Sequence, residues 1–247
     1  MYDLAIVVPA RRGSSRVANK SMLPFGTSRS LIEWKLRQLS EIIDPRRIYL
    51  SSEDDEFLAI AASLGVSQHK RDRRLATGHI APMSDVITGV VADIPYAHIA
   101  WATVVCPLMG PQEYLSAFRR YQELVIDGPH DSLLGVNAMQ EFFWFKGEPL
   151  NYRADSGHVY SQDLLPVCKV TNSLFMAPRA SMLDWRYFFG PAPHLEPLSR
   201  LAGVDIDHME DYQIARALYP VYVEAQHSVN GLADRIEWPP AAGRDSA

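Results

Sequence analysis

Short apolar runs alternate with segments of helical period along most of this chain. Strand-like runs occupy 5–8, 47–52, 99–105 and 131–137, and a shorter extended piece begins at Val66. Helices are predicted over 30–39, 54–65, 84–91 and 111–124, with Ser28 or Ser30 as the first cap and Gly65 ending the second helix. Such alternation predicts an α/β fold around a mostly parallel sheet with right-handed crossovers.

The first apolar run opens into a basic loop. Pro9 ends the run, because proline cannot donate to a strand ladder. The loop then carries Gly13, two serines and the cations Arg11, Arg12, Arg16 and Lys20. Amides near a glycine, together with guanidinium and ammonium groups, suit phosphates, although neither G-x-x-x-x-G-K-[ST] nor G-x-G-x-x-G is present. Two interpretations stay open here: a phosphate-binding loop, and a surface loop that happens to be basic.

A pair of carboxylates stands near the other end of the chain. Residues 203–207 are predicted as a short strand, followed by a helix over 209–218. In an extended segment Asp205 and Asp207 share one face while Ile206 turns into the core. Two close carboxylates repel each other unless a cation lies between them, so Mg²⁺ is a reasonable guest. Glu210 and Asp211 have a simpler explanation as first-turn acids stabilised by the helix dipole.

These features meet if the sheet is parallel, since ligands bind at the carboxyl ends of parallel strands. The basic loop, the end of the strand at Val105 and the two aspartates would then share one site. From the residues alone, metal binding by Asp205 and Asp207 and a purely structural role both remain open. A cationic loop beside two carboxylates favours chemistry on a triphosphate, which needs cations and a metal ion.

Composition limits the other possibilities. The chain has 247 residues and a net charge of −5, which argues against general nucleic-acid binding. Cys106 and Cys168 show no metal or disulfide spacing, and Cys106 reads as a small buried hydrophobe. The eight histidines show no ligand spacing, and no G-x-S-x-G nucleophile signature appears. We expect no signal peptide, no membrane span and a cytoplasmic protein.

The helical period is lost between Met139 and Val170, where Phe142, Trp144 and Phe145 cluster. We predict an extended, hairpin-like insertion over 139–172 within a single domain of residues 1–226, followed by a C-terminal tail over 227–247. An apolar arm of this kind buries itself against a partner subunit in many small enzymes, which favours a homodimer. Packing of the arm on its own core is the alternative that the sequence leaves open.

Several motifs together resemble the bacterial sugar-acid cytidylyltransferases, the CMP-sialic acid synthetases with the CMP-Kdo synthetases as close relatives. The opening match is Pro9-Ala10-Arg11-x-Gly13-Ser14-x-Arg16-x-x-x-Lys20. Further matches follow in order: Ser51-Ser52-Glu53-Asp54, Arg71-x-x-x-Leu75-Ala76, Ser84-Asp85-Val86-Ile87, Cys106-Pro107-Leu108, Gln162-Asp163-Leu164 with Asn172, and Asp205-Ile206-Asp207-x-x-x-Asp211. They span about residues 5 to 218.

The resemblance implies a three-layer α/β/α nucleotidyltransferase (Rossmann-like) fold that dimerises through an extended arm. It implies that the nucleotide-binding residues are Ala10, Arg11, Gly13, Ser14, Lys20, Arg71 and His79, with Arg11, Ser14 and Lys20 on the CTP phosphates and Arg71 and His79 close to the cytidine. It makes Lys20, Arg11 and Asp207 the catalytic residues, with Lys20 stabilising the departing pyrophosphate. Asp205 and Asp207 would hold Mg²⁺.

The chain departs from the family pattern at the acceptor end. Thr103 stands where the family has a glutamine that meets the sugar, and Val105 stands where a Kdo-type enzyme has an acidic metal ligand. The acceptor-binding residues carried over are Thr103, Gln162 and Lys169. The resulting hypothesis is a cytidylyltransferase that moves CMP from CTP to sialic acid or another nonulosonic acid and releases pyrophosphate. The alternatives are a phosphonate or Kdo-like acceptor, and a non-catalytic nucleotide-binding relative.

Overall fold

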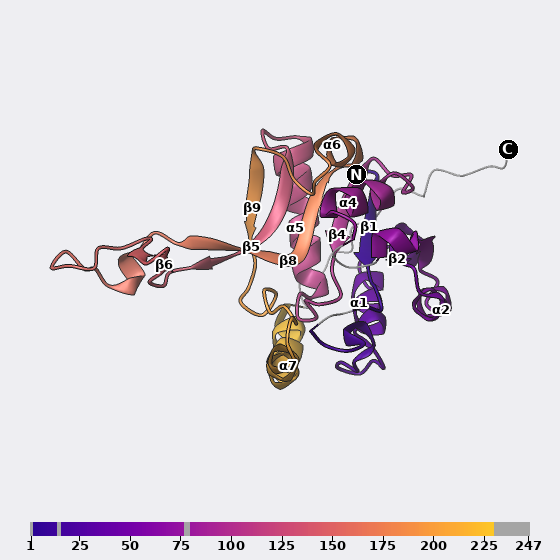
Figure 1. Ribbon diagram of the computed structural model, residues 1–247, viewed down its shortest axis with the longest axis horizontal. Coiled ribbons are helices and arrows are strands. Elements are labelled where there is room, and N and C mark those ends of the chain that lie inside the picture. The colour runs from indigo at the N-terminus through magenta and orange to yellow at the C-terminus, as the bar shows by residue number, and fades with distance from the viewer. Residues whose placement is uncertain (1, 14–15, 77–79, 230–247) are drawn as a thin grey trace.

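A seven-stranded sheet with strand order β3-β2-β1-β4-β8-β5-β9 forms the centre of the protein (Figure 1). The computed structural model describes residues 2–13, 16–76 and 80–229. The strands are β1 Leu4–Pro9, β2 Ile48–Ser52, β3 Ser67–Lys70, β4 His98–Ala102, β5 Ser132–Met139, β8 Val167–Pro178 and β9 Pro193–Pro197. Neighbouring strands run parallel, except that β8 is antiparallel to both β4 and β5. The mostly parallel sheet expected from the sequence is confirmed.

Helices connect the strands. They are α1 Leu31–Ser40, α2 Asp55–Ser63, α3 Arg73–Ala76, α4 Met83–Val91, α5 Pro111–Tyr121, α6 Arg179–Trp185 and α7 Met209–Val229, with short turns at Lys20–Met22 (η1), Pro45–Arg47 (η2), Gln122–Ile126 (η3) and Ser161–Asp163 (η4). Ser30 caps α1, because its hydroxyl accepts a hydrogen bond from the Glu33 amide. Asp54 caps α2 in the same way, and Gly65, at φ +71°, follows its last turn.

The alternation of side chains along β1 builds the three layers. Leu4, Ile6 and Val8 pack with α1, α2 and α5 in one core cluster. Ala5 and Val7 point to the opposite face and pack with α4 and α6 in a second cluster. The sheet is therefore covered on both faces, as the three-layer expectation requires. Within the described residues, no helix has both the length and the apolar character needed to cross a membrane.

Helix α7 is longer than the predicted helix over 209–218, since it continues through Pro220 to Val229. Packing explains the extension: Tyr222 is 5% exposed, and its hydroxyl accepts a hydrogen bond from Gln38 of α1 at 2.8 Å. Residues 227–229, expected to begin a tail, are the end of this helix, and residues 230–247 lie outside the described part.

Two predicted strands need correction. The strand predicted over 99–105 ends earlier, because β4 stops at Ala102, which forms the last pair between β4 and β8 with Leu174. Residues 203–207 form no strand; a single hydrogen bond, from the Ile206 amide to the Val105 carbonyl at 2.9 Å, joins the two segments. Elements α3, α6 and β9 were not predicted. The predicted insertion over 139–172 ends too late, because β8, which leads back into the sheet, begins at Val167.

The segment between β5 and β8 projects from the body as an arm (Figure 1). It carries two short paired strands, β6 Trp144–Phe145 and β7 Glu148–Pro149. Phe142 stacks on His158 within the arm, but the Trp144 and Phe145 side chains are each 60% exposed. The alternative in which the arm packs on its own core is therefore wrong for these two aromatic residues.

Candidate active site

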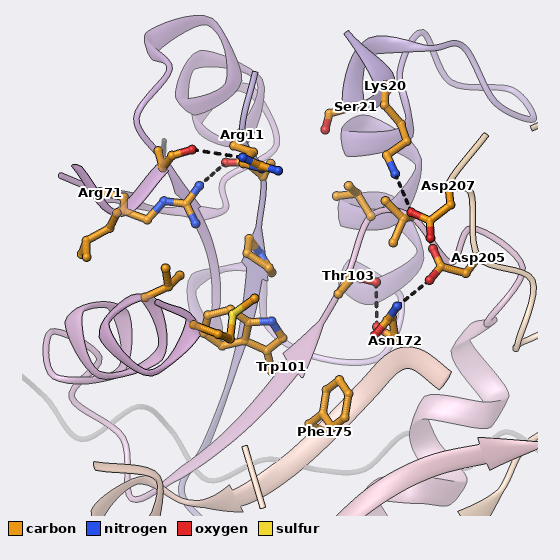
Figure 2. A pocket seen from close by; sticks show the side chains of 18 of the residues that line it. Arg11, Lys20, Ser21, Arg71, Trp101, Thr103, Asn172, Phe175, Asp205 and Asp207 are labelled. Carbon is orange, nitrogen blue, oxygen red and sulfur yellow. Dashed lines mark hydrogen bonds and ion pairs between the residues drawn. The ribbon is translucent and has the colours of Figure 1, made fainter. Parts of the chain in front are cut away.

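A cavity of about 570 Å³ lies at the carboxyl ends of β1 and β4. Figure 2 shows its arrangement: Arg11 and Arg71 lie on one side, Lys20, Asp205 and Asp207 on the other, and Trp101 and Phe175 at the base. The loop after β1, the end of β4 and the segment before α7 thus meet, as the topology argument predicted. The described lining residues include four cations and two carboxylates, so the cavity has a net positive charge suited to an anion. The cations are Arg11, Arg16, Lys20 and Arg71, and the carboxylates are Asp205 and Asp207.

Lys20 projects from η1 toward the segment before α7 (Figure 2). Its Nζ donates to the Ile206 carbonyl and lies 3.6 Å from Asp207 Oδ1, and its side chain is 13% exposed. Arg16 reaches the same Asp207 oxygen at 3.0 Å. The loop and the aspartate segment are thereby linked by ion pairs on one side of the cavity.

Asp205 and Asp207 both line the cavity, while Ile206 between them is fully buried, as expected from their alternation. Oδ2 of Asp205 accepts a hydrogen bond from Asn172 Nδ2 at 2.5 Å. Oδ1 is buried and has no hydrogen-bond partner among the described residues. Burial raises the pKa of Asp205, the Asn172 hydrogen bond opposes that rise, and the charge of Asp207 adds to it.

This donor set fits Mg²⁺. A hard cation prefers carboxylate oxygens and is commonly held by one or two of them, with phosphates and waters completing its shell. The buried, unpartnered Oδ1 of Asp205 is an oxygen that such a cation would satisfy. In the described part of the chain, no group of three or more His, Cys, Asp or Glu side chains is placed to hold a metal ion. Other ligands would therefore come from the substrate and from water.

Asp211 has the structural role that the sequence suggested. Its Oδ2 accepts hydrogen bonds from the amides of Asp207 at 3.0 Å and His208 at 2.7 Å, at the start of α7. The hydrogen bond from the His208 amide is the main reason that the pKa of Asp211 is lowered. Asp211 thus fixes the backbone beside Asp207 without lining the cavity itself.

The opposite side of the cavity presents Arg11 and Arg71 (Figure 2). Arg71 donates to the Ala10 carbonyl at 2.8 Å, and Arg11 NH1 donates to the Ala76 carbonyl at 3.5 Å. Arg71 Nε is buried without a hydrogen-bond partner among the described residues, so it remains a donor for a ligand. Ser14 and His79, also predicted for the nucleotide, lie outside the described residues.

An aromatic cluster at the base of the cavity was missed from the sequence. Phe175 stacks on Phe188 with 4.7 Å between ring centroids, and Trp101 meets Phe188 edge-on at 5.1 Å. All three side chains line the cavity. Trp101 stands two residues before Thr103, so the period-2 rule for strands would have placed it on the same face. Phe175 and Phe188 carried no comparable local signal.

The structure gathers only part of the predicted site. Ala10, Arg11, Lys20, Arg71, Thr103, Asp205 and Asp207 all line the cavity. Gly13 is exposed and does not line it, and Gln162 lies on the arm in η4. Lys169, on β8, does not line it either, although its charge acts on the Asp205 carboxylate. Within one chain, therefore, four of the seven predicted nucleotide-binding residues line the cavity, whereas of the predicted acceptor-binding residues Thr103 alone does so.

Comparison with solved structures bears on the fold. The structure of a CMP:2-keto-3-deoxy-manno-octonic acid synthetase complexed with CTP superposes with a TM-score of 0.63 at 12% identity, covering 89% of this chain and 99% of that one. A cytidylyltransferase from Leptospira borgpetersenii gives 0.59 at 16% identity, covering 94% and 95%. The expected nucleotidyltransferase fold is confirmed.

Comparison of the sequence is more specific. The family described as "Cytidylyltransferase" matches residues 5–99, which contain the basic loop and Arg71. A pseudaminic acid cytidylyltransferase from Campylobacter jejuni is 24% identical over 232 residues, covering 89% of this chain and 97% of the relative. The resemblance noted in the sequence is confirmed, and the protein is a nucleotidyltransferase enzyme that is similar to these cytidylyltransferases.

Proposed function

We propose that this protein transfers CMP from CTP to a nonulosonic acid and releases pyrophosphate. The observation that carries the proposal is the cavity itself, in which Lys20 and the pair Asp205 and Asp207 face Arg11 and Arg71 at the carboxyl edge of the sheet. This arrangement offers cations for a triphosphate on both sides and carboxylates for a metal ion on one.

Lys20 and Arg11 would bind the phosphates in this reaction. The acceptor hydroxyl loses its proton to water and its oxygen attacks the α-phosphorus of CTP in line. A new O–P bond forms while the bond from the α-phosphorus to the α–β bridging oxygen breaks, and that oxygen leaves with pyrophosphate. Charge builds on the departing pyrophosphate, and the Lys20 ammonium group is placed to stabilise it. Positioning and neutralisation of charge supply most of the rate, and the protein forms no covalent bond with the substrate.

We assign Asp205 and Asp207 as the ligands of a bound Mg²⁺. When bound, the ion would neutralise phosphate charge and orient the triphosphate. Asn172 would hold Asp205 in place through its hydrogen bond to Oδ2, which leaves the buried Oδ1 for the cation. Asp207, linked to Lys20 and Arg16, would keep the basic loop close to the same ion.

Arg71 would contact the cytosine, since its unpartnered Nε needs an acceptor and a pyrimidine carbonyl oxygen can provide one. At the base of the cavity, Trp101, Phe175 and Phe188 leave an apolar wall for the acceptor. Nonulosonic acids carry a carboxylate, and the relative from Campylobacter jejuni is named for one of them. Thr103, Gln162 and Lys169 remain predicted acceptor contacts.

We also propose a homodimer that forms through the arm. Gln162 lies on the arm, away from the cavity of its own chain, and the arm exposes Trp144 and Phe145. An apolar arm with such side chains is typical of an interface. Because the proposed reaction consumes CTP, we expect it to run in the cytoplasm.

The test is release of pyrophosphate from CTP and Mg²⁺ across a panel of acceptors: pseudaminic and sialic acids, a Kdo-like acid and phosphonates. We expect turnover with at least one of the two nonulosonic acids, and much slower turnover with the Kdo-like acid and the phosphonates. If the enzyme prefers a phosphonate or the Kdo-like acid, the proposed acceptor, a nonulosonic acid, is wrong and the preferred compound takes its place. CTP binding without turnover on any acceptor would favour a non-catalytic nucleotide-binding relative and contradict the proposal.

A further inference from the structure

Glu53 joins the two cationic elements on one side of the cavity. It follows β2 directly and precedes Asp54, the cap of α2, and its side chain is 17% exposed. Oε1 accepts a hydrogen bond from the backbone amide of Arg12 at 3.1 Å, and Oε2 accepts one from Arg71 NH2 at 3.4 Å. A single carboxylate thus contacts the basic loop with one oxygen and a cavity-lining arginine with the other.

Arg71 depends on this contact. Its side chain is 4% exposed, and burial lowers its pKa while the charge of Glu53 opposes that change. Its NH2 group divides its contacts between Glu53 and the Ala10 carbonyl at 2.8 Å. Nε stays unpartnered in the described structure, so the guanidinium is oriented by contacts at NH2 and presents another nitrogen to a ligand.

The loop is held at the same place. The Ala10 amide donates to the Ser51 carbonyl at 3.0 Å, and the Arg12 amide donates to Glu53. The Arg12 side chain turns away to Asp54 and Glu56, whereas Arg11 lines the cavity. Both amides that flank Arg11 are therefore fixed to the end of β2, and this fixes the direction in which Arg11 leaves the backbone.

We propose that Glu53 is a positioning residue for nucleotide binding. It sets the spacing between Arg11 and Arg71, which form one side of the cavity, and it touches neither the reacting atoms nor the metal ligands. The inference rests on the proposed function, because a nucleoside triphosphate is the ligand that this side of the cavity would hold.

The sign of the expected effect separates positioning from simple electrostatics. Glu53 is an anion beside a site for a polyanion, so Coulomb repulsion alone predicts that removal of its charge strengthens CTP binding. If Glu53 acts by orienting Arg71 and the loop, removal of its charge weakens binding instead. A charge-assisted hydrogen bond lost at a binding site corresponds to roughly a tenfold loss of affinity.

The experiment compares Glu53→Gln with Asp55→Asn. Asp55 carries the same charge two residues away, is 90% exposed and pairs with Lys70. Asp55→Asn therefore removes one negative charge near the site without removing a contact to Arg12 or Arg71. The dissociation constant of CTP with Mg²⁺ is measured by calorimetry without acceptor, followed by KM and kcat with acceptor. We expect Glu53→Gln to raise the dissociation constant and the KM for CTP about tenfold, with kcat at saturating CTP within about twofold. Asp55→Asn should leave both unchanged or slightly strengthen binding.

Glu53→Ala, which removes both acceptor oxygens, should weaken CTP binding more than Glu53→Gln, and thermal melting of each variant shows whether it folds. Binding of CTP by Glu53→Gln as tight as by the wild type, or tighter, overturns the positioning role while leaving the proposed function intact. Equal weakening by Asp55→Asn also overturns it. A wild-type protein that binds no CTP overturns the proposed function together with this inference.

Discussion

Lys20 and Asp207 make the sharpest residue-scale prediction, because they form an ion pair on one side of the cavity. Lys20→Ala removes the ammonium group assigned to the departing pyrophosphate, and Asp207→Asn removes one of the two carboxylates assigned to the metal ion. Each should lower kcat by at least about a hundredfold. Steady-state pyrophosphate release checks this, with Arg29→Ala and Asp184→Asn as controls of equal charge change outside both the cavity and the arm. Near-wild-type turnover in either site variant would contradict the assignment.

These two side chains, with Arg11, Arg71 and Asp205, could be named from the sequence because each stands in a short motif of the resemblance. Arg11 and Arg71 also lie just after strands β1 and β3. Asn172 stands in one of those motifs too, but its hydrogen bond to Asp205 was not predicted. That contact depends on the antiparallel pairing of β8 with β4, and the sequence did not indicate the direction of β8. The aromatic base of the cavity depends on packing among β4, β8 and the segment after α6, which no local pattern encodes.

A second residue, Lys35, gives a prediction about pH. It is fully buried on α1, with Nζ donating to the Met109 carbonyl at 3.1 Å and to the Tyr114 hydroxyl at 3.2 Å. Burial lowers the pKa of Lys35 to about 7, although the nearby Cys106 and Glu113 act in the opposite direction. Between this value and the ordinary lysine value of 10.5, the unfolded chain binds a proton that the folded chain lacks. Stability must therefore rise with pH across that window.

Lys35→Met tests the effect, because it preserves volume and cannot titrate. We expect the variant to be more stable than the wild type at pH 7 by about 1–3 kcal/mol, with the difference shrinking as pH approaches 10. Urea unfolding at several pH values measures it, with Lys70→Met, at an exposed lysine outside the arm, as control. Parallel pH profiles for Lys35→Met and the wild type would show that Lys35 does not titrate in this window.

At the scale of elements, the start of α7 carries a stability prediction. The Asp211 carboxylate caps the helix through the amides of Asp207 and His208, so Asp211→Ala should lower stability by about 1 kcal/mol. The pKa of Asp211 is lowered in the fold, so this contribution is present above the ordinary value of 3.8 and is lost as pH falls below it. Unfolding at pH 7 and pH 3 checks both parts. An equal loss at both pH values would mean that the charge is not involved.

The elements themselves were predictable where sequence period and burial agree. Strand β1 is a continuous apolar run that ends at Pro9, and helices α1, α2 and α4 each have an apolar period that begins after Ser30, Asp54 or Pro82. The segment 203–207 alternates like a strand but forms none: the Ile206 amide bonds to the Val105 carbonyl, whereas the Val204 amide turns back to the Leu201 carbonyl. The length of α7 was equally hidden, since Pro220 argues against continuation while the contact of Tyr222 with Gln38 favours it.

At the scale of the whole molecule, the exposed apolar side chains of the arm predict a dimer. Leu165 is 84% exposed and Trp144 and Phe145 are each 60% exposed, on a segment that projects from the body. Side chains of this kind contribute about 2 kcal/mol each when buried, and in a two-fold dimer each residue counts twice. We therefore expect the wild type to have a mass near twice 27.8 kDa by light scattering.

Trp144→Ser combined with Phe145→Ser should shift that mass toward the monomer, whereas Ile214→Ser, which removes a 52% exposed apolar side chain from α7, should not. If Gln162 or Lys169 contacts the acceptor in the partner's cavity, the monomeric double variant should still bind CTP but lose turnover. A wild type that is already monomeric and active would contradict the dimer. A double variant that is monomeric yet fully active would show instead that each chain completes its own acceptor site.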